Sequence, residues 1–153
     1  MNAAARQIVA ALRLEPLPHE GGFYRATWRS ETASAMLFLL TSEDFSAWHR
    51  LAQDEVWHFH AGDPVEHLRL HPRSGVVEAT RLGSNVVAGD APQVVVPAGV
   101  WQGARLAGAG HGFALLGCTV SPPWNEGGFE LAARDALEAA FPAHPGIIRA
   151  LTR

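Results

Sequence analysis

Side chains capable of chemistry are concentrated in residues 49–62, whose sequence is HRLAQDEVWHFHAG. This stretch holds three histidines and two carboxylates, with a tryptophan and a phenylalanine between them. Histidines and carboxylates grouped in this way act either as ligands of a metal ion or as the acid and base of a proton transfer. The alternative is an ordinary strand that has polar residues at its edges and no chemical role.

Residues 54–60 are typical of a strand, in which alternate side chains point to opposite faces. One face then carries Glu55, Trp57 and Phe59, and we expect this aromatic face to line the interior. A carboxylate in an apolar interior requires a hydrogen bond, a cation or a proton, which makes Glu55 the most informative residue of the chain. The alternative places Glu55 at the end of the strand, in solvent or bonded to an arginine.

The opposite face of this strand carries His58 and His60. A simple hairpin through the turn AGDP would bring His67 opposite His58. We expect these three histidines to form an outward patch. Burial against a second subunit or exposure to solvent is favoured over metal binding, because two histidines at i and i+2 are a weak signal.

The elements around this stretch predict a mainly β chain flanked by helices. Residues 3–14 have the apolar spacing of an amphipathic helix that ends before two prolines. Many short strands with Gly/Pro turns follow from about 22 to 120, which indicates an antiparallel sandwich or barrel. Residues 130–151 are rich in Ala, Leu and Glu and predict a C-terminal helical segment. No linker divides the chain, so residues 1–153 are expected to form one domain.

Composition excludes several classes of protein. Of 153 residues 48% are hydrophobic, and the formal net charge is −3, which argues against disorder and against a nucleic-acid partner. No apolar run approaches membrane-spanning length and no secretory signal is evident, so we expect a soluble cytoplasmic protein with no membrane partner. Cys118 is the single cysteine and is expected to be a buried structural thiol.

The strand pattern and the polar stretch together resemble a cupin, the small jelly-roll barrel. The first cupin motif, G-x5-H-x-H-x(3,4)-E-x6-G, is matched by His49, Glu55 and Gly62 with the spacing kept. The second motif, G-x5-P-x-G-x2-H-x3-N, is matched by the sequence PAGVWQ at residues 97–102. Longer blocks resemble the uncharacterised cupin-five branch: HEGGFYRATWRS, FSAWHRLAQDEVWHFHAGDP, PQVVVPAGVWQGARL and GCTVSPPW. The resemblance implies an antiparallel double-stranded β-helix with terminal helices, and usually a homodimer, but no established reaction.

Two departures from the cupin motifs argue against a tightly bound metal cofactor. Metal-dependent cupins hold one divalent ion with three histidines and a glutamate, whereas here Leu51 and Gln102 stand at the second and third histidine positions. Leucine offers no lone pair, and an amide oxygen is a poor ligand for first-row transition metals. No cofactor is therefore firmly predicted. If a metal is bound, its ligands are His49, Glu55 and Gln102, completed by water and a chelating substrate.

A pocket without a metal still offers acid–base chemistry. We expect His49 and Glu55 on adjacent strands, both directed at the cavity, where a carboxylate beside an imidazole would favour a general base. Some cupins use a metal-free pocket to epimerise nucleotide-linked sugars through a histidine base. The alternative is that His49 and Glu55 are an inert buried pair left from a lost metal site.

Further residues are candidates for ligand contact. Trp57, Phe59 and Trp101 would supply stacking surface and Gln102 a polar contact, if each faces inward. In the block HEGGFYRATWRS, Glu20, Tyr24 and Arg25 could recognise an anionic or hydroxylated ligand at the mouth of the barrel. The favoured alternative for that block is a tight Gly-Gly turn followed by a strand that pairs with a neighbouring subunit.

Three functions therefore stay open. The leading one is an isomerase or epimerase that binds a small ring-bearing molecule such as a sugar or nucleotide-sugar, with His49 and Glu55 as acid and base. The second is a non-catalytic binding or sensor module with the same pocket. The third is a metal-dependent enzyme with the incomplete set His49, Glu55 and Gln102.

Overall fold

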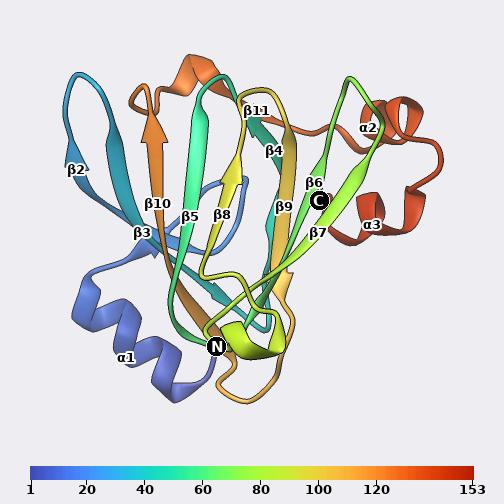
Figure 1. The fold of residues 1–153 in the computed structure, drawn as a ribbon. Helices are drawn as coiled ribbons and strands as arrows, with labels where there is room; N and C mark the ends of the chain where they lie inside the picture. Colours follow the sequence, from blue (N-terminus) through green and yellow to red (C-terminus); the bar gives the residue numbers. More distant parts are fainter.

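Two antiparallel sheets face each other and form the predicted jelly roll (Figure 1), in a computed structural model that describes all residues 1–153. The first sheet has the order β1-β2-β3-β10-β5-β8, and the second has the order β11-β4-β9-β6-β7. The strands are β1 (Glu15–Pro16), β2 (Phe23–Arg29), β3 (Ser34–Thr41), β4 (Ser46–Leu51), β5 (Asp54–Gly62), β6 (Val65–Leu70), β7 (Val77–Leu82), β8 (Gln93–Val96), β9 (Trp101–Leu106), β10 (Phe113–Ser121) and β11 (Phe129–Leu131). The mainly β fold class is confirmed.

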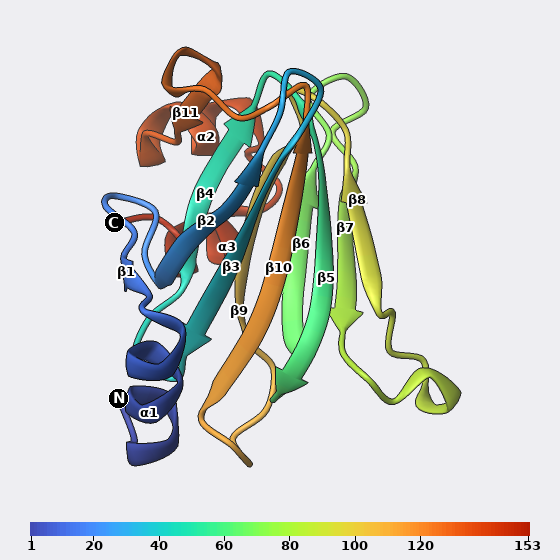
Figure 2. The same cartoon turned by 90° about the vertical axis from the view of Figure 1, so that its left-hand side faces the viewer.

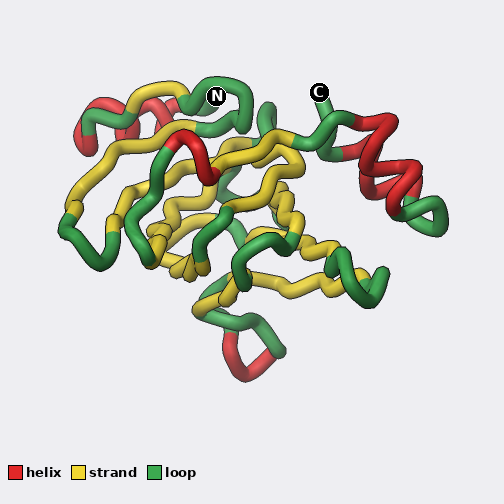
Figure 3. The backbone as a smooth tube through the Cα atoms, turned by 90° about the horizontal axis from the view of Figure 1, so that it is seen from above, coloured by secondary structure: helices red, strands yellow, loops and turns green.

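The terminal helices cover the outer faces of different sheets (Figures 2 and 3). Helix α1 (Ala3–Leu12) begins at Asn2, whose side chain accepts a hydrogen bond from the Ala5 amide at 2.9 Å. Its apolar face packs against the outer face of the first sheet. Helices α2 (Arg134–Ala140) and α3 (Pro145–Ala150) pack instead on the outer face of the second sheet.

The C-terminal segment differs from the prediction at its start. Residues Phe129–Leu131 form β11, which pairs with β4, and helix begins only at Arg134. Two short 3-10 helices, η1 (Val86–Ala88) and η2 (Glu126–Gly128), complete the elements. Strand β11 forms because it extends the free edge of β4, a tertiary interaction that outweighs local helix propensity.

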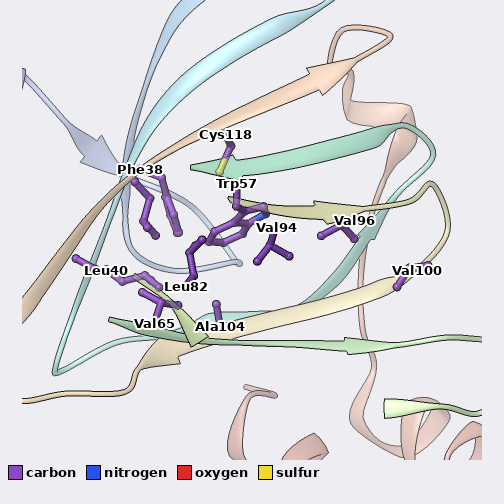
Figure 4. Packing of buried hydrophobic residues seen from close by; sticks show 12 residues of the cluster. Phe38, Leu40, Trp57, Val65, Leu82, Val94, Val96, Val100, Ala104 and Cys118 are labelled. Carbon is purple, nitrogen blue, oxygen red and sulfur yellow. The ribbon is translucent and has the colours of Figure 1, made fainter. Parts of the chain in front are cut away.

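Apolar side chains from both sheets fill the space between them. Figure 4 shows Trp57 in the middle of this interior cluster, with Val94 and Leu82 beside it and Cys118 above. Phe38 meets Trp57 edge to face, with ring centroids 5.5 Å apart. Cys118 is buried, and burial raises the pKa of its thiol.

Consecutive strands cross between the two sheets in the region of the polar stretch. Strand β4 belongs to the second sheet, β5 to the first and β6 to the second. Side chains from β4 and β5 therefore reach the interior from opposite walls, and β5 and β6 do not form a hairpin. None of the helices has the length and apolar character that a membrane crossing requires.

Candidate functional site

His49 lies on β4 with its ring in the interior, and only 2% of the residue is exposed. Its Nδ1–H donates to the Ala47 carbonyl oxygen at 2.7 Å. In a neutral ring this hydrogen bond leaves the Nε2 lone pair free to accept a proton. The imidazole also stacks on Phe129 from β11, with centroids 5.5 Å apart and planes 25° from parallel.

Glu20 supplies the carboxylate nearest to this base, with Oε2 3.9 Å from His49 Nε2. The buried carboxylate accepts a hydrogen bond from Ser46 Oγ at 2.8 Å. Gly21 and Gly22, both with positive φ, follow it, and a Cβ on either would collide with a backbone oxygen. The Gly-Gly turn therefore fixes Glu20 beside His49, and a negative charge there attracts a positively charged ring.

Glu55 enters the interior from the opposite wall, on β5, and is 4% exposed. Its Oε2 accepts a hydrogen bond from Gln102 Nε2 at 2.6 Å. Burial raises the pKa of the Glu55 carboxyl, and the charge of His49 opposes this effect without cancelling it. The Glu55 carboxyl therefore keeps its proton to a higher pH than an ordinary glutamate, and in that form it is a proton donor.

Gln102 connects Glu55 to a second buried histidine. Its Oε1 lies 3.3 Å from His67 Nε2, and the His67 ring meets Trp57 edge to face with centroids 4.8 Å apart. Burial and the neighbouring Arg69 charge lower the pKa of His67 to about 3, so its imidazole is neutral. His67 Nδ1 and Trp57 Nε1 are buried without a protein partner, which adds one acceptor and one donor to the interior.

Two placements expected from the sequence are wrong. His49 and Glu55 lie on strands of different sheets rather than on adjacent strands, because residues 52 and 53 join the two walls. His67 is fully buried in the interior rather than in an outward patch, because β6 pairs with β7 and β9 and never with β5. His58 and His60 do lie on the outer face of the first sheet, where His58 hydrogen-bonds Thr119 and Gln93.

The expected ligand-contact residues divide between inside and outside. Trp57, Phe59 and Tyr24 belong to the interior cluster. Trp101 instead packs on the outer face of the second sheet under the C-terminal helices, with the Arg50 guanidinium 4.6 Å from its ring centroid. Arg25 is exposed on β2, next along the chain to the inward Tyr24. Trp101 and Arg25 therefore do not reach the interior.

The polar interior does not fit the metal centre of a metal-dependent cupin. Gln102 turns its amide N–H, and not its oxygen, toward Glu55. The Nε2 atom of His49 has the Glu20 carboxylate beside it, and Glu55 lies on the other wall. No group of three or more His, Cys, Asp or Glu side chains is arranged to hold a metal ion. His49, Glu55 and Gln102 are therefore arranged as a hydrogen-bonded polar interior rather than as the ligand set of a divalent metal.

Solved structures with the same fold include two that align over nearly the whole chain. A Shewanella oneidensis protein is 37% identical, with a TM-score of 0.90 over 100% of this chain and 98% of its own. A hypothetical protein from Leishmania major is 29% identical, with a TM-score of 0.91 over 97% and 98%.

A more distant solved structure supports the fold but gives no evidence on function. A dTDP sugar isomerase from Desulfovibrio desulfuricans is 19% identical, with a TM-score of 0.60 over 84% and 85%, which shows the fold alone. No curated protein matches the sequence.

The family comparison agrees with the motifs and with the fold. Residues 6–132 match Cupin_5, described as Cupin superfamily (DUF985). This match takes in the strands that carry His49, Glu55, His67 and Gln102, as well as Glu20 in its turn. The chain belongs to the Cupin_5 family of the cupin superfamily.

Proposed function

We propose that this protein binds a small polar molecule, a sugar or a nucleotide-linked sugar, inside the barrel and isomerises or epimerises it by proton transfer. The observation that carries the proposal is the orientation of His49. Its Nδ1–H is held by the Ala47 carbonyl, so Nε2 is the atom that accepts a proton. Glu55, on the opposite wall, has a raised pKa and supplies the matching acid.

In the proposed reaction His49 Nε2 removes a proton from a carbon beside a carbonyl group. Glu55 donates its proton to the carbonyl oxygen, so the substrate becomes an enol and no net charge is lost or gained. Returning a proton to the other face of that carbon, while the enol oxygen gives its proton back to Glu55, gives the epimer. Returning it to the neighbouring carbon, while a hydroxyl on the first carbon gives its proton to Glu55 and becomes the new carbonyl, gives the isomer. Glu20 stabilises the protonated His49 ring by charge attraction between these steps.

A ligand reaches these groups only if packed side chains move. His49, Glu55 and Gln102 are each less than 5% exposed. Phe129, which is half-buried on the short strand β11 and stacked on His49, is the side chain that we expect to be displaced. Segments joined by few contacts open at low free-energy cost, and β11 is three residues long.

The test is exchange of substrate hydrogen with solvent. The protein is incubated in D2O with a panel of sugars, sugar phosphates and nucleotide-sugars, and loss of carbon-bound proton signals is followed by NMR. We expect exchange with at least one compound. His49→Asn should abolish it, and Glu55→Gln should slow it by about 10²–10⁴-fold, the range of a lost general acid.

His60→Asn is the matched control, because it removes an exposed histidine from the outer face of the same strand that carries Glu55. It should exchange at the wild-type rate. Exchange that survives in His49→Asn contradicts the assignment of the base.

The second candidate is a non-catalytic binding module, which is favoured by the partners that His49 and Glu55 already have within the protein. Its distinguishing outcome is a compound that binds, with shifts of the Trp57 and Gln102 side-chain signals, but shows no exchange at any pH.

A further inference from the structure

An open pocket lies at one end of the barrel, separate from the polar interior. Its volume is about 530 Å³. It lies between the end of β4, the turn from β6 to β7 and the turn from β8 to β9, at the upper end of the molecule in Figure 1. The lining residues are Arg50, His71, Pro72, Arg73, Ser74 and Pro97–Val100.

The lining is cationic in a chain whose formal net charge is −3. Two arginines and a histidine line the pocket. No carboxylate is among the lining residues, although Glu130, Glu78 and Asp54 contact Arg50, His71 and the Ala98 amide. Pyrrolidine rings and a glycine–alanine turn supply the rest of the wall. This combination suits an organic anion, because guanidinium groups bind phosphate through paired hydrogen bonds while apolar walls contact the rest of the molecule.

Arg50 is held in place before any ligand arrives. Its Nε donates to Glu130 Oε2 at 2.7 Å, its Nη2 lies 2.6 Å from the same oxygen in an ion pair, and its guanidinium lies over the Trp101 ring. The donors of Nη1 have no protein partner. An arginine fixed in this way loses little side-chain entropy when it binds an anion.

Arg73 and the facing turn leave the pocket open. The exposed Arg73 makes no ion pair and no hydrogen bond within the protein, so its whole guanidinium is available to a ligand. On the facing turn, Gly99 has a φ of 79°, and nothing lies within 4 Å of the place where a Cβ would stand. A ligand can therefore approach the backbone of this turn closely.

We propose that this pocket binds the phosphoryl group of a small organic phosphate, with Arg50 and Arg73 as the principal contacts. The binding does not depend on the reaction proposed for the barrel interior. Arg50 and the interior His49 are consecutive on β4, so their side chains lie on opposite faces of the second sheet. The two sites can therefore be occupied together.

The test is titration of ¹⁵N-labelled protein with inorganic phosphate, ribose 5-phosphate, ADP and adenosine. We expect the amide signals of Ser74, Gly99 and Val100 to shift with the phosphorylated organic compounds but not with adenosine. Stronger shifts with ribose 5-phosphate or ADP than with inorganic phosphate identify an organic phosphate as the ligand. Equal affinity for inorganic phosphate overturns the organic part of the proposal.

Arg73→Gln and Arg50→Gln should each weaken binding roughly tenfold, as expected when a charge-assisted hydrogen bond is lost. Arg105→Gln is the matched control, since it removes another ion-paired arginine from the outer face of the second sheet, here paired with Glu66. It should bind like the wild type. If no phosphate shifts these amides at millimolar concentration, or if the shifts map to residues around His49 and Glu55, the pocket is not the site.

Discussion

At the scale of single residues, the side chains of His49, Glu55 and Gln102 each have a partner within the protein. His49 lies between the Ala47 carbonyl and Glu20, and Glu55 is bonded to Gln102, which also contacts His67. Partners of this kind are required because an unpaired buried polar group is costly. The result is a base and an acid that face a common interior without forming an ion pair with each other.

Glu55→Gln should change how stability depends on pH. Burial raises the pKa of the folded-state carboxyl above the ordinary value near 4.5, so above this pH the native state binds more protons than the unfolded state. The wild type therefore loses stability as pH rises from 4.5 to the folded-state pKa, by at most about 1.4 kcal/mol per pH unit. The glutamine variant should lack this loss.

Urea unfolding of both proteins at pH 5, 6, 7 and 8 measures the difference. Glu31→Gln, at an exposed position, is the control and should follow the wild type at every pH. A Glu55→Gln variant that is less stable than the wild type by an increasing margin at high pH would mean that the native site favours the ionised carboxyl.

Strand alternation predicted part of the site from the sequence and could have corrected another part. The pattern placed Glu55 and Trp57 on the inward face, where the structure has them. Trp101 and Gln102 are consecutive on β9, so only one of them can face inward, and the same holds for Tyr24 and Arg25 on β2. The pairing of Glu20 with His49 was not predictable from the sequence. It depends on a long-range contact in which Ser46, on the same strand as His49, hydrogen-bonds Glu20, 26 residues earlier in the chain.

At the scale of elements, the C-terminal helices explain why apolar residues occur on both faces of the second sheet. Trp48, Leu68, Leu70 and Trp101 point outward but are covered by α2 and α3. In β6 the outward residues are Glu66, Leu68 and Leu70, two of which are apolar, while the inward ones are Val65, His67 and Arg69. His67 was expected outside because a simple hairpin through the turn AGDP would place it opposite His58, whereas β6 pairs with β7 and β9.

Trp101→Ala tests the outward placement of this tryptophan. Because Trp101 packs against the C-terminal helices, its removal should cost about 3–5 kcal/mol in the free energy of unfolding. The exchange of substrate hydrogen with solvent should persist at temperatures where the variant stays folded. Chemical denaturation followed by circular dichroism measures the stability.

Trp124→Ala provides the comparison, since Trp124 is 42% exposed and its loss should cost far less. Abolished exchange in a folded Trp101→Ala protein would place Trp101 in the ligand site after all.

At the scale of the whole molecule, the homodimer that the family resemblance implies is a proposal. One row across the outer face of the first sheet is largely apolar and joins two exposed residues, Trp28 and Val95, which are 54% and 57% exposed. The row runs through Trp28, Ala35, Thr119, Val56 and Val95, which are cross-strand partners in turn. We propose that this row lies against a second copy of the chain.

Light scattering coupled to size-exclusion chromatography measures the assembly. The wild type should elute with the mass of a dimer at micromolar concentration, and Val95→Lys should shift it to a monomer. Val87→Lys is the control, because Val87 is fully exposed in η1 and away from this row. A monomeric wild type, or an equal effect of both lysines, would contradict the proposed interface.

The central claim is that His49 Nε2 is the atom that accepts a proton, and the tautomer of His49 tests it most directly. Long-range ¹H–¹⁵N NMR spectra of the neutral ring, assigned with His49→Asn, distinguish a protonated Nδ1 from a protonated Nε2. The hydrogen bond to the Ala47 carbonyl predicts a proton on Nδ1 and a free lone pair on Nε2. A neutral ring with its proton on Nε2 would leave no base directed at the interior and would contradict the account.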